Sequence, residues 1–149
     1  MSGKIIIVGA TGYTGTALAK LLKQENIDCH LIGRNESELE KLANETGQSF
    51  SVCSNVSDEQ SVSESLSSIT DDKIIGLAYC VGSIVLKSFQ TTKTDDFINT
   101  FNLNVTGAIH FIKKLQKQLA DNNGSIVLFS TVAVDRGFNM HSVISTAKG

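Results

Sequence analysis

The sequence of 149 residues contains no proline, no internal repeat and no linker-like segment. It has no block of basic residues and a formal net charge of −2, so nothing in it indicates a nucleic-acid or membrane surface. No apolar run approaches the length of a membrane span, and the N-terminus lacks the charged-then-apolar pattern of a signal peptide. The composition, with 41% hydrophobic and 19% charged residues, is that of one soluble globular domain with a real core.

Metal-binding and disulfide-forming residues are also few. The cysteines and histidines are Cys29, Cys53, Cys80, His30, His110 and His141. The cysteines are odd in number and far apart, which argues against a disulfide framework and favours a reducing cytoplasm. The histidines share no metal-ligand spacing, so we expect them to be structural and expect no metal site.

The rest of the chain is organised around one stretch, KIIIVGATGYTG at Lys4–Gly15. The β-branched run Ile5–Val8 predicts a strand that is buried on both faces. Gly9, Gly12 and Gly15 follow at three-residue spacing, and an apolar helical face comes after them. Glycines let the backbone turn tightly and approach a diphosphate, which the helix N-terminus then binds. The pattern favours nucleotide binding, with an ordinary strand-to-helix turn as the alternative.

Strand and helix patterns alternate along the whole chain. The predicted strands are Ile5–Val8, Ile27–Gly33, Ser49–Cys53, Ile74–Cys80 and Ser125–Ser130. One helix is predicted directly after the glycine loop, and a second contains Leu39–Ala43. The other predicted helices are Asp58–Ile69, Asp95–Ala120 and Ser142–Gly149. Thr94 is the predicted N-cap of the long helix, and Asp71 and Asp72 form a predicted turn. Repeated units of this kind predict an α/β fold, a three-layer doubly wound parallel sheet of strand order 3-2-1-4-5.

The long predicted helix, Asp95–Ala120, has more apolar positions than one buried stripe needs. The predicted stripe is Phe101, Val105, Ala108, Ile112, Leu115 and Leu119. Phe97, Leu103 and Phe111 lie partly off this stripe, so we expect a homodimer through this helix. In the alternative, these side chains pack under the loops of a monomer.

In a doubly wound sheet, ligands bind beyond the carboxyl ends of the strands. Arg34 follows the second predicted strand, 19 residues after Gly15, where the adenosine ribose of a dinucleotide would lie. An acid at this place binds a 2′-hydroxyl, whereas an arginine pairs with a 2′-phosphate. Arg34 therefore predicts NADP(H) rather than NAD(H), with a solvated loop charge as the alternative.

Six motifs, in order, resemble those of the short-chain dehydrogenase/reductase family, and the resemblance extends along essentially all 149 residues. They are GATGYTG at Gly9–Gly15, GRN at Gly33–Asn35, NVSD at Asn55–Asp58, NVTG at Asn104–Gly107, GSIVLFST at Gly124–Thr131 and HSVISTAKG at His141–Gly149. The resemblance implies an NAD(P)-dependent Rossmann-fold oxidoreductase that transfers a hydride between the coenzyme and a small carbonyl or alcohol substrate.

The resemblance also implies roles for single residues. Asn104 would support a water-linked proton relay, Thr131 would hydrogen-bond the substrate oxygen, and Lys148 would bind the nicotinamide ribose. Asn55 stands where an aspartate often contacts adenine. The implied coenzyme-binding residues are Gly9, Thr11, Gly12, Tyr13, Gly15, Arg34, Asn35, Asn55, Val56, Gly82 and Lys148.

The chain departs from the family pattern in three places. The glycine spacing is Gly-x2-Gly-x2-Gly in place of Gly-x3-Gly-x-Gly, and Tyr79–Gly82 stands where Asn-Asn-Ala-Gly is usual. The third departure is at the catalytic tyrosine, four residues before Lys148, where this chain has Ile144. Isoleucine transfers no proton, and a general acid contributes roughly 10²–10⁴-fold in rate, so we expect carbonyl turnover to be slow or absent. Tyr79, predicted to face the same cleft, is a weaker candidate for the acid, and Tyr13 is expected to pack in the glycine loop.

Two hypotheses therefore stand side by side. The motifs favour an NADP-dependent oxidoreductase, whereas Ile144 favours a dinucleotide-binding pseudoenzyme or regulatory protein. The family continues after the position of Lys148 with two further strands and a substrate loop. We therefore expect a fragment of a longer polypeptide, with association that covers the apolar surface as the alternative.

Overall fold

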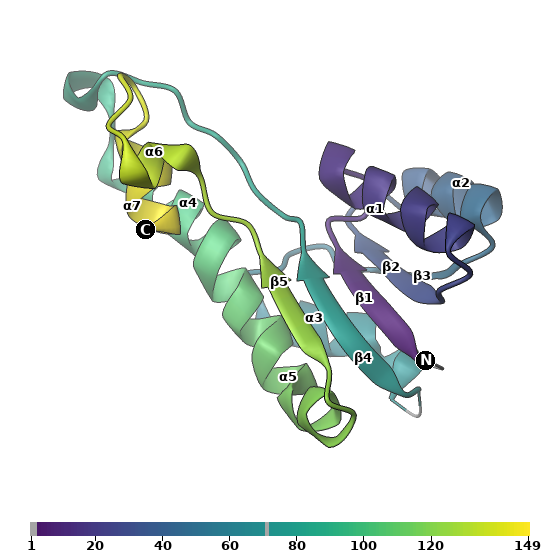
Figure 1. The fold of residues 1–149 in the computed structure, drawn as a ribbon. Helices are drawn as coiled ribbons and strands as arrows, with labels where there is room; N and C mark the ends of the chain where they lie inside the picture. The colour runs from purple at the N-terminus through teal and green to yellow at the C-terminus, as the bar shows by residue number, and fades with distance from the viewer. Residues whose placement is uncertain (1–2, 71) are drawn as a thin grey trace.

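The structure is a computed structural model that describes residues 3–70 and 72–149. Five parallel strands form one sheet in the order β3-β2-β1-β4-β5, which confirms the predicted topology (Figure 1). The strands are β1 (Lys4–Val8), β2 (Cys29–Gly33), β3 (Ser49–Val52), β4 (Ile74–Tyr79) and β5 (Ser125–Leu128). The strand order reverses between β1 and β4, and a ligand crevice is expected at the carboxyl ends of these strands.

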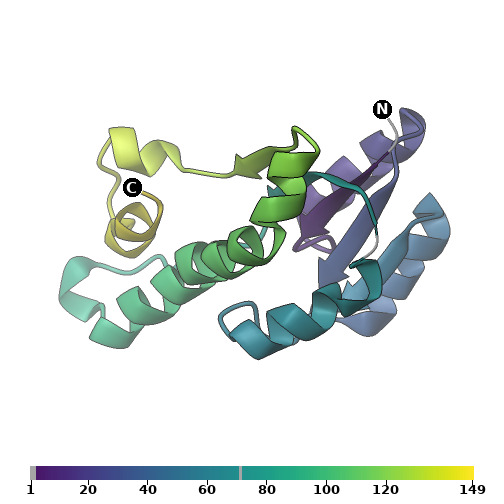
Figure 2. The same cartoon turned by 90° about the horizontal axis from the view of Figure 1, so that it is seen from below.

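Helices lie on both faces of the sheet. They are α1 (Tyr13–Gln24), α2 (Glu36–Thr46), α3 (Glu59–Leu66), α4 (Thr94–Phe101), α5 (Gly107–Asp121), α6 (Val132–Asp135) and α7 (Ser142–Lys148). In Figures 1 and 2, α1 and α2 lie on one face of the sheet, and α3 and α5 lie on the other. The two helices α6 and α7 lie beyond the carboxyl end of β5, where α7 packs against α4. Within residues 3–70 and 72–149, no helix is both long enough and apolar enough to cross a membrane.

The side chains of β1 alternate between the two layers, as the two-residue period of a strand requires. Ile6 and Val8 pack with α3 and α5 in one core cluster, and Ile7 packs with α1 and α2 in the other. All three side chains are completely buried. Within the sheet, Ile7 pairs with Leu31 of β2 on one side and with Ala78 of β4 on the other. The glycine loop therefore follows a strand that is paired with a neighbour on each edge and packed against helices on both faces.

The strand ends differ from the predicted ones. β2 begins at Cys29 rather than Ile27, because the Ile27 N–H donates to the Leu22 carbonyl at the end of α1. β3, β4 and β5 end at Val52, Tyr79 and Leu128, and each is shorter than predicted at its carboxyl end. The turn predicted at Asp71 and Asp72 lies partly outside the described residues.

The predicted long helix is divided into two α-helical parts. Its first part, α4, begins at Thr94, and the cap is Lys93 rather than Thr94. The Lys93 N–H donates to Asp96 Oδ2 at 2.9 Å, so an acidic side chain in the first turn pairs with a backbone N–H group at the helix N-terminus. Residues Asn102–Thr106 then form a π-helical turn, and α5 follows directly.

The π turn changes which side chains of this helix are buried. Phe101, predicted in the buried stripe, is 47% exposed, whereas Phe111, predicted off the stripe, is completely buried. A π turn holds an extra residue, so a stripe traced at a constant 3.6-residue period loses its phase across it. The prediction was therefore wrong at these two positions, which lie on opposite sides of the insertion.

Tyr79 explains why the π turn forms here. The Gly107 N–H donates to the Asn102 carbonyl, five residues back, and the Tyr79 hydroxyl donates to the Leu103 carbonyl at 2.6 Å. A Cβ at Gly107 would collide with this hydroxyl and would lie 2.9 Å from Val56 Cγ2. Tyr79 is 3% exposed, and burial raises the pKa of its phenol. The prediction that Tyr79 faces the cleft was wrong, because its hydroxyl points into the α5 layer.

Candidate active site

A cleft of about 980 Å³ opens at the carboxyl ends of β1, β2, β3 and β4. Its lining includes most of the predicted coenzyme-binding residues, namely Gly9, Thr11, Gly12, Arg34, Asn35, Asn55, Val56 and Gly82. It also includes Glu36, Glu38, Ser83 and Leu103, which the sequence reasoning did not select. Three residues of the predicted set, Tyr13, Gly15 and Lys148, do not line this cleft.

The glycine turn has the geometry that a diphosphate requires. Gly9 has a φ of 80°, and a Cβ there would lie 2.9 Å from the Val81 nitrogen. Gly12 is exposed at the start of α1, so backbone and helix terminus are open to a phosphate. Gly15 is buried, and a Cβ on it would collide with the Gly9 carbonyl and lie 2.7 Å from Ala10 Cα. Gly15 therefore lets α1 pack against the turn without facing the cleft.

The loop between β2 and α2 places charges of both signs at one end of the cleft. Arg34 is exposed at this end, as predicted from the sequence. Asn35 caps α2, because its Oδ1 accepts from the Ser37 hydroxyl at 2.8 Å and from the Glu38 N–H at 3.3 Å. Glu36 and Glu38 line the cleft with Arg34, so two carboxylates compete there with any phosphate. Their sequence signal was the preference for acids in a first helical turn.

Asn55 and Val56 follow β3 and line the cleft together with the glycine turn. The Asn55 Oδ1 accepts from the Ser57 N–H at 3.0 Å, and the Asn55 N–H donates to Ser61 Oγ at 3.2 Å. These bonds fix the amide, so the Nδ2 end is the end available to a ligand. Val56 is 6% exposed and supplies an apolar floor beside Gly107.

Gly82 connects the cleft to a second group of polar atoms. A Cβ on Gly82 would lie 3.2 Å from Asn104 Oδ1 and 3.6 Å from Lys148 Nζ, so both atoms border the same small space. Asn104 is 9% exposed and donates through Nδ2 to the Thr100 carbonyl at 2.8 Å. Its Oδ1 has no hydrogen-bond partner in the described part of the chain. Lys148 Nζ donates to the Phe129 carbonyl at 2.7 Å, and burial lowers the pKa of this ammonium.

Two positions of the predicted catalytic set remain. Thr131 lies directly before α6, and Ile144, at the place of the family's catalytic tyrosine, lies in α7. Thr131 caps α6, and its Oγ1 accepts from the Ala133 N–H at 3.3 Å, which leaves its proton to donate. Ile144 is 2% exposed and belongs to the packed face of α7. Tyr13, at the start of α1, is 96% exposed, so the expectation that it packs in the glycine loop was wrong.

The parallel sheet of order 3-2-1-4-5, flanked by helices, together with the glycine turn defines a Rossmann fold, and the cleft lies where the strand order reverses. Residues 3–149 match the short chain dehydrogenase family. A serine 3-dehydrogenase from Agrobacterium fabrum is 31% identical over 145 residues, which cover 89% of this chain and 55% of that protein. A tropinone reductase homolog from Arabidopsis thaliana is 28% identical over 152 residues, which cover 97% and 56%. The solved structure of a short-chain type dehydrogenase/reductase from Mycobacterium ulcerans aligns with a TM-score of 0.90 at 16% identity, over 99% of this chain and 58% of that one.

The chain therefore belongs to the short-chain dehydrogenase/reductase family, as the six motifs indicated. It spans little more than half the length of the curated relatives it matches. Members of the family bind nicotinamide dinucleotides, and the residues of the cleft fit such a group, because the glycine turn leaves open the space that side chains would fill.

Proposed function

We propose that this chain acts as an NADP(H)-dependent oxidoreductase on a small carbonyl or alcohol substrate. The observation that carries the proposal is the continuity of the cleft. Gly9, Gly12 and Arg34 line the same cleft as Gly82, and Gly82 lies beside Asn104 and Lys148. A coenzyme held by the glycine turn and Arg34 would place its reactive ring near Gly82.

Each group has a role that follows from its chemistry. Backbone N–H groups of the glycine turn and the start of α1 would hold the diphosphate, and Arg34 would pair with the 2′-phosphate. Asn55 Nδ2 would donate to adenine, and Lys148 Nζ would donate to the nicotinamide ribose. Thr131 would donate its hydroxyl proton to the substrate oxygen. When bound, the reduced nicotinamide supplies a hydride.

Calorimetry with NADPH and NADH tests the coenzyme assignment. A charge-assisted hydrogen bond contributes about 1.5–3 kcal/mol, which is roughly 10–100-fold in affinity for NADPH. Arg34→Asp should narrow or invert this preference, and Glu36→Gln should widen it by removing a competing carboxylate. Arg136→Asp, at the exposed end of α6, is the matched control. Equal affinities in the unmutated protein would make Arg34 a loop charge only.

A second candidate function is coenzyme binding without catalysis, as in a regulatory protein. The specific observation in its favour is Ile144, a packed aliphatic side chain where the family has its acid. NADPH binding without NADPH oxidation, across a panel of aldehydes and ketones, would support this candidate.

We also propose a homodimer through the helix from α4 to α5, with contacts that differ from those predicted. Phe111 is buried, whereas Ile98, Phe101 and Ile109 are 50%, 47% and 41% exposed. Exposed apolar side chains of this kind favour association. Light scattering should show a dimer, and Ile109→Glu should convert it to a monomer. A monomer at high concentration in the unmutated protein would contradict this proposal.

A further inference from the structure

A second cavity, of about 500 Å³, adjoins the cleft of the candidate active site and has no part in the roles above. It lies between the loop after β3, the extended segment after Gly82, the helix α4 and the π turn. Asn55, Ser83 and Leu103 line both spaces, so the two meet at these residues. Small-molecule sites have volumes of about 300–1,000 Å³, and this second cavity is within that range.

Three asparagine side chains line the second cavity. Asn55 Oδ1 already accepts from the Ser57 N–H at 3.0 Å. Asn102 Oδ1 already accepts from the Thr106 hydroxyl at 3.3 Å. Each of these two amides therefore has its Nδ2 group left to donate. Within residues 3–70 and 72–149, the Asn99 side chain has no hydrogen bond, so its amide can both donate and accept.

Hydroxyl and apolar groups form the rest of the wall. Ser57 and Ser83 line the second cavity with hydroxyls that form no hydrogen bond in the part of the chain that the structure describes. Val85 and Leu103 add apolar surface. Groups that both donate and accept, next to a small apolar face, match a ligand that carries hydroxyl groups on a carbon skeleton.

The charge at the second cavity limits the ligand further. Asp96 is the one charged side chain among its described lining residues. The carboxylate accepts from Lys87 Nζ at 2.9 and 2.8 Å and from the Lys93 N–H at 2.9 Å, and these bonds hold the pKa of Asp96 below its usual range. An anionic ligand would meet this ionised carboxylate, and a cationic ligand would have to compete with Lys87. The lining therefore favours an uncharged ligand.

We propose that the second cavity binds an uncharged polyol of monosaccharide size. Ligand hydroxyls accept from the amides of Asn55, Asn99 and Asn102, and the C–H face of the ligand packs on Val85 and Leu103. The Asp96 carboxylate repels phosphorylated sugars, which gives the site its selectivity. The site is separate from the proposed coenzyme site, although Asn55 belongs to the walls of both.

NMR of the ¹⁵N-labelled full chain tests the site with three neutral probes, D-glucose, D-ribose and myo-inositol. At least one of them should shift the side-chain amide signals of Asn99 and Asn102, with saturation at millimolar concentration. For D-glucose, the 6-phosphate should bind at least about ten-fold more weakly because of its charge. Shifts that do not saturate, shifts confined to other residues, or equal affinity for glucose and its phosphate would overturn the proposal.

Two substitutions sharpen the test. Asn99→Leu keeps the size of the side chain and removes its amide, so the Kd for the neutral sugar should rise about three- to ten-fold. Asn44→Leu, on the exposed surface of α2, is the matched control and should leave the Kd unchanged. Asp96→Asn removes the carboxylate charge and releases Lys87, so the phosphorylated sugar should bind at least as tightly as the neutral one.

An unchanged Kd in Asn99→Leu, or undiminished rejection of the phosphate in Asp96→Asn, would overturn the proposal. The amide spectrum of each variant shows that it is folded. None of these measurements uses NADPH. A protein that binds the sugar and no coenzyme would therefore support this site and defeat only the proposed function.

Discussion

β2 and β5 flank the central strand pair of the same sheet, one beside β1 and the other beside β4. Every residue of β2 is buried, whereas every residue of β5 is exposed. β2 has a strand on each side and helices over both faces, whereas β5 is an edge strand with α5 over one face (Figures 1 and 2). The sheet therefore has a closed half, β3-β2-β1, and an open half around β5.

The residues proposed to bind the coenzyme and the predicted catalytic residues lie mainly in different halves of the sheet. Most of the loops proposed to bind the coenzyme follow β1, β2 and β3 in the closed half, whose packing holds them in place. Thr131, Ile144 and Lys148 follow β5, where Ile126, Val127 and Leu128 are 43%, 49% and 55% exposed. An exposed apolar edge is a site of association in folded proteins. The comparison predicts robust coenzyme binding in the closed half and impaired proton transfer in the open half.

The largest expected effect comes from the substitution Ile144→Tyr. A positioned acid contributes roughly 10²–10⁴-fold, so NADPH oxidation with carbonyl substrates should rise by about that factor. Ile144 is only 2% exposed, so the larger tyrosine side chain should lower the free energy of unfolding of the variant by about 1–3 kcal/mol. The measurements are steady-state NADPH oxidation and urea unfolding on the same preparations.

Ile144→Phe is the matched control for this substitution, since it has the size of tyrosine without the hydroxyl. It should show the loss of stability and no gain in rate. If the phenylalanine and tyrosine variants gain rate equally, the effect comes from packing of α7 rather than from a proton donor. The open half would then be impaired by its structure and not by its missing acid.

Much of the closed half was predictable from the sequence because its signals are local. The run Ile5–Val8 and the three glycines specify a strand, a tight turn and a helix without reference to the rest of the chain. Arg34 was placed at the cleft by its position after β2 alone. The strand order followed from repeated units with right-handed crossovers.

The features that the sequence reasoning missed depend on partners far apart in the chain. The π turn forms because the Tyr79 hydroxyl, 24 positions before it, donates to the Leu103 carbonyl. A constant helical period cannot contain this information, so Phe101 and Phe111 were assigned to the wrong faces. The carboxylates Glu36 and Glu38 were visible as a first helical turn, but only the folded loop places them beside Arg34.

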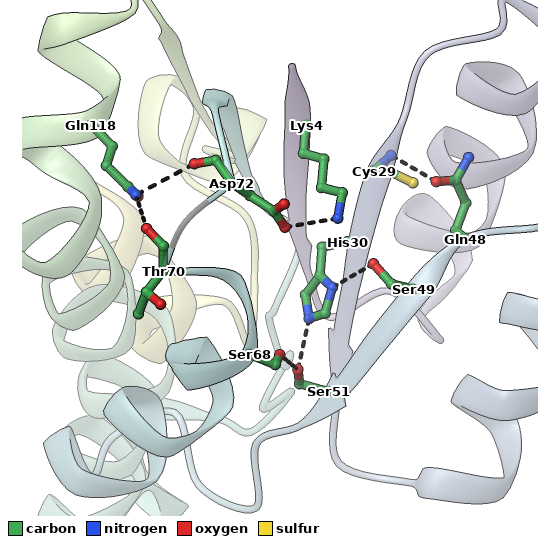
Figure 3. A network of polar contacts seen from close by, with 10 residues as sticks. All are labelled: Lys4, Cys29, His30, Gln48, Ser49, Ser51, Ser68, Thr70, Asp72 and Gln118. Atoms are coloured by element: carbon green, nitrogen blue, oxygen red, sulfur yellow. Dashed lines mark hydrogen bonds and ion pairs between the residues drawn. The ribbon is translucent and has the colours of Figure 1, made fainter. Parts of the chain in front are cut away.

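The next effect concerns the closed half and the acid stability of the fold. His30 of β2 lies between two hydroxyls, with Nδ1 2.8 Å from Ser49 Oγ and Nε2 2.7 Å from Ser51 Oγ (Figure 3). Burial, and to a lesser degree the nearby Lys4 charge, lower the pKa of His30 to about 4, although the Asp72 charge opposes this shift. The unfolded chain therefore binds more protons than the folded one between about pH 6.5 and 4. Stability from this site is present above this window and is lost as the pH falls through it.

Urea unfolding between pH 7.5 and 4 measures the free energy of unfolding. The contribution of His30 to it should fall by about 3 kcal/mol at the acid end of this range. His30→Gln removes the titration, so the difference between the two proteins isolates His30 from the carboxylates that titrate in the same range. His110→Gln should keep the full dependence. Equal pH dependence in His30→Gln and the unmutated protein would show that the closed half does not rely on a neutral imidazole.

A somewhat smaller effect is expected at Gly15, where α1 packs on the glycine turn. The Cβ of Gly15→Ala would collide with the Gly9 carbonyl, so α1 must shift, at a cost of about 1–3 kcal/mol. Since the shift moves the helix N-terminus, calorimetry should also show weaker NADPH binding. Gly137→Ala, with nothing within 4 Å of its Cβ, should leave both stability and binding nearly unchanged. Similar results for the two variants would mean that the turn is not rigid.

The smallest effect is expected at Tyr79, which joins the two halves because it lies on β4 and bonds to the helix that carries Asn104. Tyr79→Phe removes the donor to the Leu103 carbonyl and leaves a buried acceptor unpaired, at a cost of about 1–2 kcal/mol in urea unfolding. The rate of carbonyl reduction per folded molecule should not change, because Tyr79 is not among the residues that line the cleft. Gly107→Ala supplies a second measurement, since its Cβ would collide with this hydroxyl. Its cost should be smaller in the Tyr79→Phe background, although the contact with Val56 remains. A Tyr79→Phe protein of normal stability that has lost its reductase activity would make Tyr79 a proton donor, and the site of proton transfer would then lie on the central strands.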